Sequence, residues 1–595
     1  MDRAVRSRRR LSLAVLLGAL LAGVGLIVGA CSGSDTAEPP ATTQAPAPVP
    51  APPPSPTPVD GGVLRVASGP LPADLSPAAS VWDTSAQQLA RGLYDRLAVY
   101  DVNNLPRPEL AESIESDATF TRWTIRVRRG VLFHDGTPFD ASAVVANLEA
   151  QRTSPLGTHL LTPVTTVVAT NSRTVVVTMS TSWSTFPEVL ATQIGAMASP
   201  GTLVAAGAVA PIGTGPFRFP PVDGQGGEAP DSVVTVTPAV TGEVQLVRNP
   251  SYWRAGLPRL DAVRFLVIPE PGSRVSAVLR DEADLVSTDR PAQLSRLDGA
   301  AADGTVRVTE DRNAEAPKVA IALDTARAPF DSITARRAAS LATDREQLSK
   351  LAMQGQGTVA RGIISDPSPW YTDLPEPVPD LNRAKDEVAS YIAEFGQPIT
   401  AELLVPDDPF LLSIATVWRA QQATVGITIT IKPVPLAELG DLTARGQYQA
   451  ALVEGFVSPH PDLYEPLLRG LPGEQPAVNL NITRYVNPLI TQAFADARAT
   501  SDPALQVDTY RVVQEQLFLD VPWLFLLQLR QVVATSPSVR DVTGGLIAAG
   551  GRGLGQDGAA IALAPLRLVR PPGSATEPLT SATSVDLDAT GGGTG

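Results

Sequence analysis

The residues best suited to binding a ligand lie in one short segment, residues 454–468, which reads EGFVSPHPDLYEPLL. Carboxylates, an imidazole, a hydroxyl and an aromatic ring occur there together: Glu454, Phe456, Ser458, Pro459, His460 and Asp462. Such groups hold polar solutes by hydrogen bonding and stacking. The segment therefore predicts a binding loop, and an ordinary surface connection is the alternative.

The sequence carries no motif for catalysis. It has no GxSxG nucleophile motif, no HExxH zinc motif and no Gly-Lys pair of a phosphate-binding loop. Cys31 is the one cysteine, and the three histidines, His134, His159 and His460, are far apart in the chain. We predict a protein that is not an enzyme and has no cofactor or metal site, with a glycosidase-type carboxylate pair left open.

The net charge bears on the class of partner. Asp and Glu outnumber Lys and Arg by 61 to 47, which gives a formal charge of −14. Nucleic-acid binding needs a basic surface, so we expect no nucleic-acid partner.

The N-terminus resembles an export signal. Residues 1–10 carry five arginines, and an uncharged apolar stretch follows up to Ala30. The apolar stretch ends in Val-Gly-Ala-Cys, which resembles the lipobox of bacterial lipoproteins and makes Cys31 the expected lipidation site. A transmembrane anchor with an incidental cysteine is the alternative. Residues 7–11, SRRRL, also resemble a twin-arginine motif, so the export route stays open.

Two segments have the composition of spacers. Residues 31–59 are rich in Pro, Ala and Thr and predict a semi-rigid linker. Residues 571–595 predict a disordered tail.

The body between these segments alternates strand and helix patterns. From residue 400, strands are expected at 400–406, 427–434 and 448–456, with helices at 408–426 and 435–447. Strands separated by single helices imply parallel βαβ units, in which ligands bind beyond the carboxyl ends of strands. The loop after residue 454 follows such an end. Residues 333–355 predict one further helix, and Asp140 an N-cap.

Several phrases in one order resemble family 5 of the bacterial extracellular solute-binding proteins, the oligopeptide, dipeptide and nickel receptors of ABC importers. They include the following: GLYDRLAVYDVNNLPRPELAESIES (92–116), TRWTIRVRRGVLFHDGTPFDASAVVANLE (121–149), PIGTGPFRF (211–219), VQLVRNPSYW (244–253), PFDSITARRAASLATDREQL (329–348), DLNRAKDEVASYIAEFG (380–396) and YRVVQEQLFLDVPWLFLL (510–527). The resemblance spans about residues 60–545.

The resemblance implies an α/β, type II periplasmic-binding-protein fold of cluster C, with two hinged lobes and an extra domain. It divides the chain into a signal peptide (1–30), a linker (31–59), a discontinuous lobe I (60–95, 210–315 and 521–570), the extra domain (96–209), lobe II (316–520) and the tail (571–595).

The implied function is import. A lipid-anchored monomer on the outer face of the cytoplasmic membrane captures a peptide or other small polar solute between its lobes. It then delivers that solute to ABC permease subunits.

The loop departs from the peptide-binding members in one residue. Their loop has the form Gly-Trp-x-x-Asp, and the Asp accepts the peptide α-ammonium group. Here Gly455 matches the Gly, Phe456 stands at the Trp, and Pro459 falls on the Asp. Glu454 or Asp462 is then the acid that can substitute.

Without the aspartate, the loop suits a neutral or weakly polar ligand such as a sugar or a modified peptide. A nickel chelate through His460 is one alternative, and a structural role of His460 is the other. Trp82 and Trp370 are further expected ligand contacts by analogy with the family.

A second function is compatible with the same sequence. Some actinobacterial lipoproteins of this fold act in cell-envelope glycolipid assembly as adaptors or regulators. The missing aspartate and the acidic chain with its C-terminal tail fit that alternative as well.

Overall fold

The structure is a computed structural model, and it describes residues 58–72, 74–203, 211–220, 242–311, 315–375, 378–470, 479–557 and 560–569. All of them belong to the unit Pro56–Gly595. The expected signal peptide, Cys31, nearly all of the linker and the tail lie outside the described residues. No helix within the described ranges is long and apolar enough to cross a membrane.

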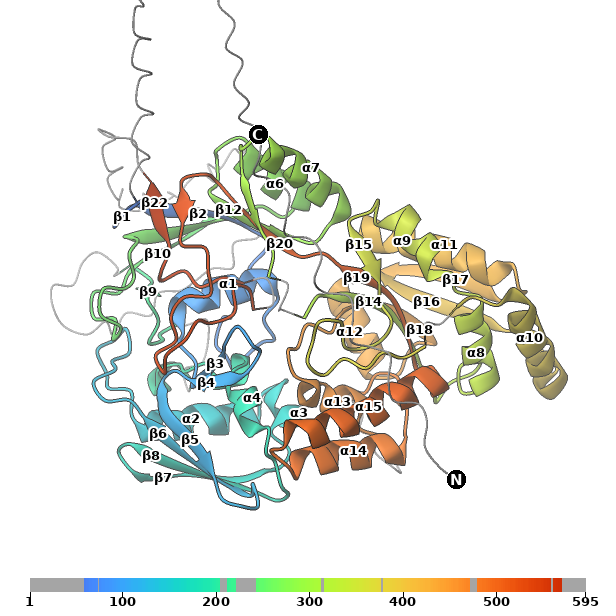
Figure 1. The fold of residues 1–595 in the computed structure, drawn as a ribbon, viewed down its shortest axis with the longest axis horizontal. Coiled ribbons are helices and arrows are strands. Elements are labelled where there is room, and N and C mark those ends of the chain that lie inside the picture. Colours follow the sequence, from blue (N-terminus) through green and yellow to red (C-terminus); the bar gives the residue numbers. More distant parts are fainter. Residues whose placement is uncertain are drawn as a thin grey trace, which may run out of the picture. The chain divides into compact units, whose positions relative to one another are not determined.

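The first lobe, which we call lobe I, is built on a mixed seven-stranded sheet (Figure 1). Its central strand, β2, is parallel to its two neighbours, β11 and β12, and the remaining neighbouring strands are antiparallel. The order is β13 (Arg307–Thr309), β20 (Val532–Thr535), β12 (Leu285–Thr288), β2 (Val63–Ser68), β11 (Ala262–Val267), β10 (Gly242–Arg248) and β9 (Phe217–Arg218). Buried side chains of the sheet face α1 (Thr84–Leu93) on one side, and α6 (Pro271–Leu279) with α7 (Pro291–Ala302) on the other.

A second mixed sheet, which we call lobe II, has six strands. The order is β15 (Gly357–Val359), β19 (Trp523–Leu529), β14 (Lys318–Leu323), β18 (Ala450–Gly455), β16 (Thr400–Pro406) and β17 (Thr428–Val434). Strand β16 is parallel to β17 and β18, as the βαβ pattern predicts, and the other pairs are antiparallel.

Helices cover both faces of the lobe II sheet (Figure 1). Side chains of β14 alternate, so that Ile321 faces one helical layer and Ala322 the other. One layer contains α8 (Ile333–Leu341), α9 (Arg345–Ala352), α10 (Leu381–Phe395) and α11 (Pro409–Ala423). The other contains α12 (Leu436–Ala444), η2 (Pro461–Tyr464), α13 (Glu465–Leu468), α14 (Pro488–Arg498) and α15 (Pro503–Asp520).

An antiparallel four-stranded sheet forms the extra domain. Its order is β5 (Ala111–Ser116), β6 (Arg122–Val127), β8 (Thr174–Met179) and β7 (Val164–Asn171). The same stretch of chain contains α2 (Ala141–Arg152), α3 (Gly157–Leu160), α4 (Phe186–Leu190), η1 (Gln193–Gly195) and α5 (Pro200–Leu203). Two small sheets complete the described strands: β3 (Ala98–Tyr100) with β4 (Pro106–Pro108), and β1 (Pro58–Val59) with β22 (Arg567–Val569) and β21 (Val539–Arg540).

Short polar residues determine where several helices begin. Asp140 caps α2 by accepting from the backbone N–H groups of Ser142 and Ala143, which confirms the predicted N-cap. The single helix predicted over residues 333–355 is wrong. The chain leaves the helix at Ala342, and Asp344 starts α9 by accepting from the Gln347 N–H.

Among the described strands, the chain passes between the two lobe sheets at two places. The chain passes from β13 in lobe I to β14 in lobe II, close to the predicted crossing at residue 315, and from β19 back to β20. The return was predicted near Val521, but β19 still belongs to the lobe II sheet, so the chain crosses after Leu529.

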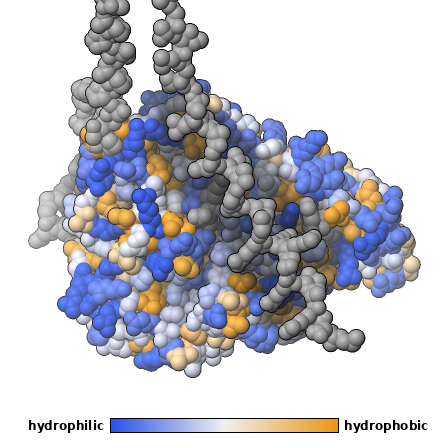
Figure 2. All heavy atoms as spheres, in the orientation of Figure 1, coloured by the Kyte–Doolittle hydropathy of each residue, from blue (hydrophilic) through white to orange (hydrophobic). Residues whose placement is uncertain are grey.

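The face shown in Figure 2 mixes hydrophilic and apolar residues. Apolar residues scattered among polar ones are usual on a surface that faces water.

Candidate ligand site between the lobes

A cavity of about 350 Å³ is bordered by both lobes. Its walls come from the carboxyl ends of strands. Ser68 ends β2, Asp289 follows β12, Asp408 follows β16, and Glu454 is next to last in β18. Carboxyl ends of strands are where open α/β sheets bind ligands. We call this space the interlobe cavity.

Arg290 is the central cation of the interlobe cavity. Its guanidinium lies 2.9 Å from Asp289 on the same lobe, and on the other lobe 2.9 Å from Glu454 and 3.5 Å from Asp408. It also lies over the ring of Phe410, 5.3 Å from the centroid. One side chain of lobe I is thereby held by three groups of lobe II.

Burial and neighbouring charge shift the pKa values of this cluster. Burial and the charge of Asp289 raise the pKa of Glu454 to about 8, although Arg290 opposes the shift. Burial lowers the pKa of Arg290, but the three carboxylates around it raise the pKa above its usual value. Glu454 is therefore a carboxyl group that can change its protonation state near neutral pH.

Carboxylates outnumber guanidinium groups around the cavity. Asp83, at the start of α1, lines it together with Asp289, Asp408 and Glu454, whereas Arg274 and Arg290 are the lining cations. Of these residues, only Glu454 was predicted as a site residue. Charged residues directly after a strand are the sequence signal that would have indicated some of the others: Asp289 and Arg290 follow β12, and Asp407 and Asp408 follow β16.

A second cavity, of about 570 Å³, lies along the two connections between the lobes. Glu310 and Glu315 line it from the first connection, and Arg530 and Gln531 from the second. Gln531 also lines the interlobe cavity. Ligand-dependent hinge motion would change this space as well.

The aromatic residue of the predicted loop points into lobe II. Phe456 is buried with its ring 5.1 Å from that of Trp523 and 5.2 Å from that of Phe525. Its backbone has a φ of 63°, a left-handed conformation that is uncommon outside glycine. This sharp turn directs the chain away from the end of β18. Phe456 does not line the interlobe cavity.

Ser458 and Pro459 are partly exposed. The Ser458 N–H donates to the Tyr464 hydroxyl at 2.9 Å, and that hydroxyl lies 3.2 Å from the Ser458 carbonyl. Neither residue lines the interlobe cavity, so their predicted contact with ligand stays a prediction.

His460 and Trp370 pack against each other inside lobe II. Their rings are 4.6 Å apart in an edge-to-face arrangement, and both side chains are buried. Burial lowers the pKa of His460 to about 4, so the ring is neutral at pH 7, and its Nδ1 accepts from the Asp462 N–H at 3.2 Å. Within the described ranges, no group of three or more His, Cys, Asp or Glu residues is placed to hold a metal ion.

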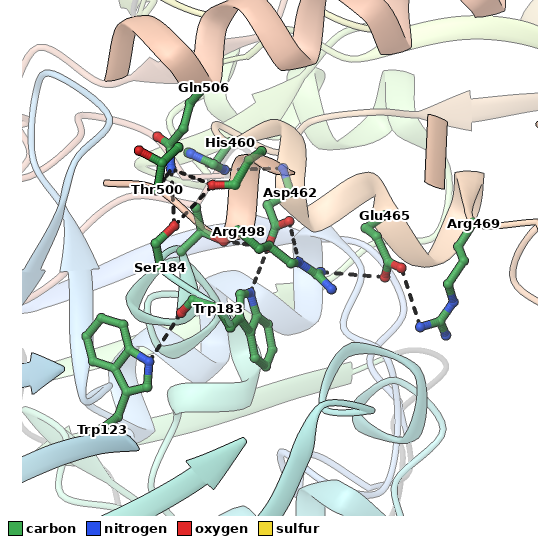
Figure 3. Close-up of polar contacts among 12 residues, drawn as sticks. Trp123, Trp183, Ser184, His460, Asp462, Glu465, Arg469, Arg498, Thr500 and Gln506 are labelled. Atoms are coloured by element: carbon green, nitrogen blue, oxygen red, sulfur yellow. Dashed lines mark hydrogen bonds and ion pairs between the residues drawn. The ribbon is translucent and has the colours of Figure 1, made fainter. Parts of the chain in front are cut away.

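Asp462 joins lobe II to the extra domain (Figure 3). Its buried carboxylate accepts from Arg498 at 2.7 Å, from the Trp183 indole at 2.9 Å and from the Thr185 hydroxyl at 2.7 Å. Burial raises the pKa of Asp462, but Arg498 and the other donors bring the net pKa below its usual value. These contacts occupy the carboxylate within the protein.

Trp82 belongs to the core of lobe I. Its ring stacks on that of Tyr94 with centroids 5.8 Å apart, and its backbone N–H donates to Gln193 of the extra domain at 3.1 Å. The next residue, Asp83, lines the interlobe cavity instead.

Comparison with known proteins agrees with this architecture. The model of the family described as bacterial extracellular solute-binding proteins, family 5 Middle, matches residues 106–470. The chain belongs to family 5.

A curated relative of this family 5 protein is the glutathione-binding protein GsiB of Pectobacterium atrosepticum. It is 25% identical over 475 residues, which cover 76% of this chain and 86% of GsiB. The same-named protein of Escherichia coli K12 is 25% identical over 479 residues, which cover 77% of this chain and 87% of the relative.

Solved structures of similar fold include AgaA of A. tumefaciens R10 in complex with agropinic acid. It has a TM-score of 0.71 and 20% identity, and the match covers 86% of this chain and 99% of AgaA. The oligopeptide-binding protein AppA of Bacillus subtilis, in complex with a nonapeptide, has a TM-score of 0.68 and 21% identity, covering 82% and 96%. These likenesses show the type II binding-protein fold of family 5, with two α/β lobes and an extra domain.

Proposed function

We propose that this family 5 solute-binding protein captures a small polar solute in the interlobe cavity and delivers it to the permease of an ABC importer. The pairing of Arg290 with Glu454 carries the proposal, because side chains of both lobes converge there on the lining of one cavity. We further propose that Cys31 carries a lipid that holds the receptor on the outer face of the cytoplasmic membrane.

The cross-lobe contacts suit a receptor that opens and closes. Two connections between described strands join the lobes, and the pairs of Arg290 with Glu454 and Asp408 must break if the lobes separate. Hinge closure around a ligand is a common motion of two-lobed binding proteins. A ligand that replaces one of these pairs would enter as the lobes open and be enclosed as they close.

The charges of the interlobe cavity favour a ligand with a cationic or donor-rich group. Four carboxylates and two guanidinium groups line it, so a bound ammonium or hydroxyl-rich group adds a favourable partner. Glu454 is the carboxylate best placed to take over from the missing family aspartate. A peptide-like solute with a free amine therefore fits the cavity, and its volume limits the ligand to a small molecule.

The adaptor function remains a second candidate because the loop at residues 454–468 offers few free side chains to a ligand between the lobes. Pro459 supplies no charge, and the side chains of Phe456, His460 and Asp462 contact other parts of the protein. A protein that binds an envelope component through its outer surface would not need a ligand between its lobes.

Ligand capture is tested by native mass spectrometry of the purified protein, followed by thermal-shift and calorimetric titration. The panel contains di- to pentapeptides with free and acetylated N-termini, sugars, and nickel with histidine. We expect one solute class to bind with micromolar affinity, and Glu454→Gln to weaken it by about tenfold or more if an ammonium group is bound. Arg445→Gln, at an exposed ion pair, is the control. If no member binds and no small molecule co-purifies, the adaptor function is favoured.

A further inference from the structure

A third cavity, of about 480 Å³, lies within lobe II beside strand β19. We call it the β19-edge pocket. Its lining residues come from α8, α9, α10, α15 and β19, together with residues 361–363, 374, 378 and 521. It shares no lining residue with the interlobe cavity or with the cavity along the connections. The proposed function therefore makes no use of it.

The pocket exists because β19 is only partly paired. On one side, β14 pairs with β19 along most of its length. On the other side, β15 pairs with Leu527–Leu529 alone, and among the described strands none continues along Trp523–Phe525. The Phe525 carbonyl instead accepts from the Arg345 side chain at 2.7 Å. This leaves a space between the strand edge and the helices α8 and α15.

The charge of the pocket is opposite to that of the chain. Four arginines line it, and none of the described lining residues is acidic: Arg337, Arg345, Arg361 and Arg383. Arg361 lies 3.7 Å from Asp373, which is not a lining residue. Arg337 and Arg383 are exposed and form no ion pair with a described residue, and Arg337 donates to the Leu519 carbonyl at 3.5 Å. In a protein of formal charge −14, two exposed guanidinium groups that form no ion pair with a described residue, placed beside an apolar pocket, favour an anionic ligand.

The remaining walls are apolar. They are formed chiefly by aliphatic and aromatic side chains: Leu341, Ile363, Leu517, Phe518, Trp523 and Phe525. Trp523 is 4% exposed, and its indole N–H has no hydrogen-bond partner among the described residues. A buried donor without a partner costs about 1–3 kcal/mol, and an acceptor on a ligand would remove that cost. The pocket thus combines an apolar wall, an unused donor and a cationic rim.

We propose that the β19-edge pocket is a second binding site, for a small organic anion with an apolar body such as an aryl or alkyl carboxylate. The anionic group lies among the arginines and the apolar body lies against the side chains of α15 and β19. Pockets of several hundred Å³ with apolar walls and a few polar groups are typical of small-molecule sites. The site is independent of the interlobe cavity and of any solute bound there.

Decanoate is the probe, and isothermal titration calorimetry of the full chain is the measurement. Decylammonium has the same chain with the opposite charge, and decanol has no charge. We expect saturable binding of one decanoate per protein, with decylammonium and decanol about tenfold or more weaker. The affinity for decanoate should also fall as the salt concentration rises.

Variants locate the binding. Arg337 and Arg383 are exposed, so the double change Arg337→Gln/Arg383→Gln should leave the fold intact and weaken decanoate by about tenfold or more. Arg280→Gln/Arg445→Gln removes the same charge from exposed sites elsewhere and should leave the affinity unchanged. Trp523→Phe keeps a ring but removes the N–H, and a several-fold loss is expected. Glu454→Gln, in the interlobe cavity, should have no effect.

Three results would each overturn the proposal. They are equal affinities for decanoate and decylammonium, an unchanged affinity in the Arg337→Gln/Arg383→Gln variant, and no saturable binding at millimolar decanoate. A loss caused by Glu454→Gln alone would place decanoate in the interlobe cavity and would also count against the second site. If no solute binds in the interlobe cavity, the proposal for the β19-edge pocket still stands.

Discussion

The Arg290 guanidinium of lobe I lies 2.9 Å from the Glu454 carboxylate of lobe II, across the interlobe cavity. The two residues are 164 positions apart in the chain. About a fifth of each side chain is exposed, so water screens their attraction less than at the surface, but the cost of burying Glu454 outweighs that attraction and keeps its pKa raised. Separation of the lobes must break this contact and return both groups to water.

Arg290→Gln should favour the open state. The change leaves Glu454, Asp289 and Asp408 close together without their shared cation, which disfavours the closed state by about 1–3 kcal/mol. Small-angle X-ray scattering of the ligand-free protein should then give a larger radius of gyration than the wild type. Arg280→Gln, which removes an exposed arginine of lobe I, is the control and should not change it. An unchanged radius in Arg290→Gln would show that this pair does not hold the lobes together.

The raised pKa of Glu454 predicts a pH dependence of stability. A carboxyl group whose pKa is about 8 in the folded protein, against an ordinary 4.5, holds its proton more tightly when folded. The favourable contribution of this group to the free energy of unfolding is complete below about pH 4.5 and is lost as the pH rises through about 8. Glu454→Gln imitates the protonated form. The melting temperature of the variant, relative to the wild type, should therefore rise between pH 5 and pH 9. Parallel curves would contradict the raised pKa.

Local patterns allowed much of lobe II to be predicted from the sequence. The succession β16, α11, β17, α12 and β18 follows from strand and helix periodicity, and each element carries its own signal. The break between α8 and α9 was missed because residues 333–355 keep a helical period across it. The return of the chain was placed near Val521, one strand too early, because a buried strand such as β19 does not reveal which sheet it joins.

The interlobe cavity was less predictable than the fold. Glu454 lies near the end of a recognisable strand, whereas Arg290 gains its cross-lobe role through contacts with Asp408 and Glu454, more than a hundred positions away. Aromatic and imidazole side chains are types that bind ligands, yet Phe456 and His460 of the loop pack inside lobe II. Residue type suggests what a side chain can bind, whereas its direction depends on backbone geometry such as the positive φ of Phe456.

Asp462 should be essential for stability. Its carboxylate is fully buried and is the closest partner of the buried Arg498 guanidinium, so Asp462→Ala leaves a charge without adequate compensation. We expect a loss of about 3–5 kcal/mol in the free energy of unfolding, measured with urea. Asp441→Ala, at an exposed pair with Arg445, should cost less than about 1 kcal/mol. Similar losses in the two variants would exclude a special role of the contact with the extra domain.

Cys31→Ser tests the proposed lipid anchor. If Cys31 is lipidated, the wild type should partition into the detergent phase of Triton X-114, since acyl chains contribute about 0.8 kcal/mol per buried CH₂ group. The serine variant should move to the aqueous phase or appear in the culture medium. Mass spectrometry of the mature N-terminus provides the independent readout. Retention of the variant in the membrane would instead indicate that the apolar segment before Cys31 acts as a transmembrane anchor.

Pro459→Asp should restore the charge that peptide-binding members of family 5 carry in this loop. Pro459 is partly exposed, so the new backbone N–H and carboxylate can reach water without a large cost to folding. If the alignment of the loop is correct, the carboxylate will accept the α-ammonium group of a peptide. Calorimetry should then show that the ratio of the affinity for trialanine to that for N-acetyl-trialanine is at least about tenfold higher in the variant than in the wild type. Pro459→Asn, which has nearly the same shape and no charge, should give little of this gain. Equal behaviour of the Asp and Asn variants would show that position 459 does not face the amine and would leave Glu454 as the acid for a cationic ligand.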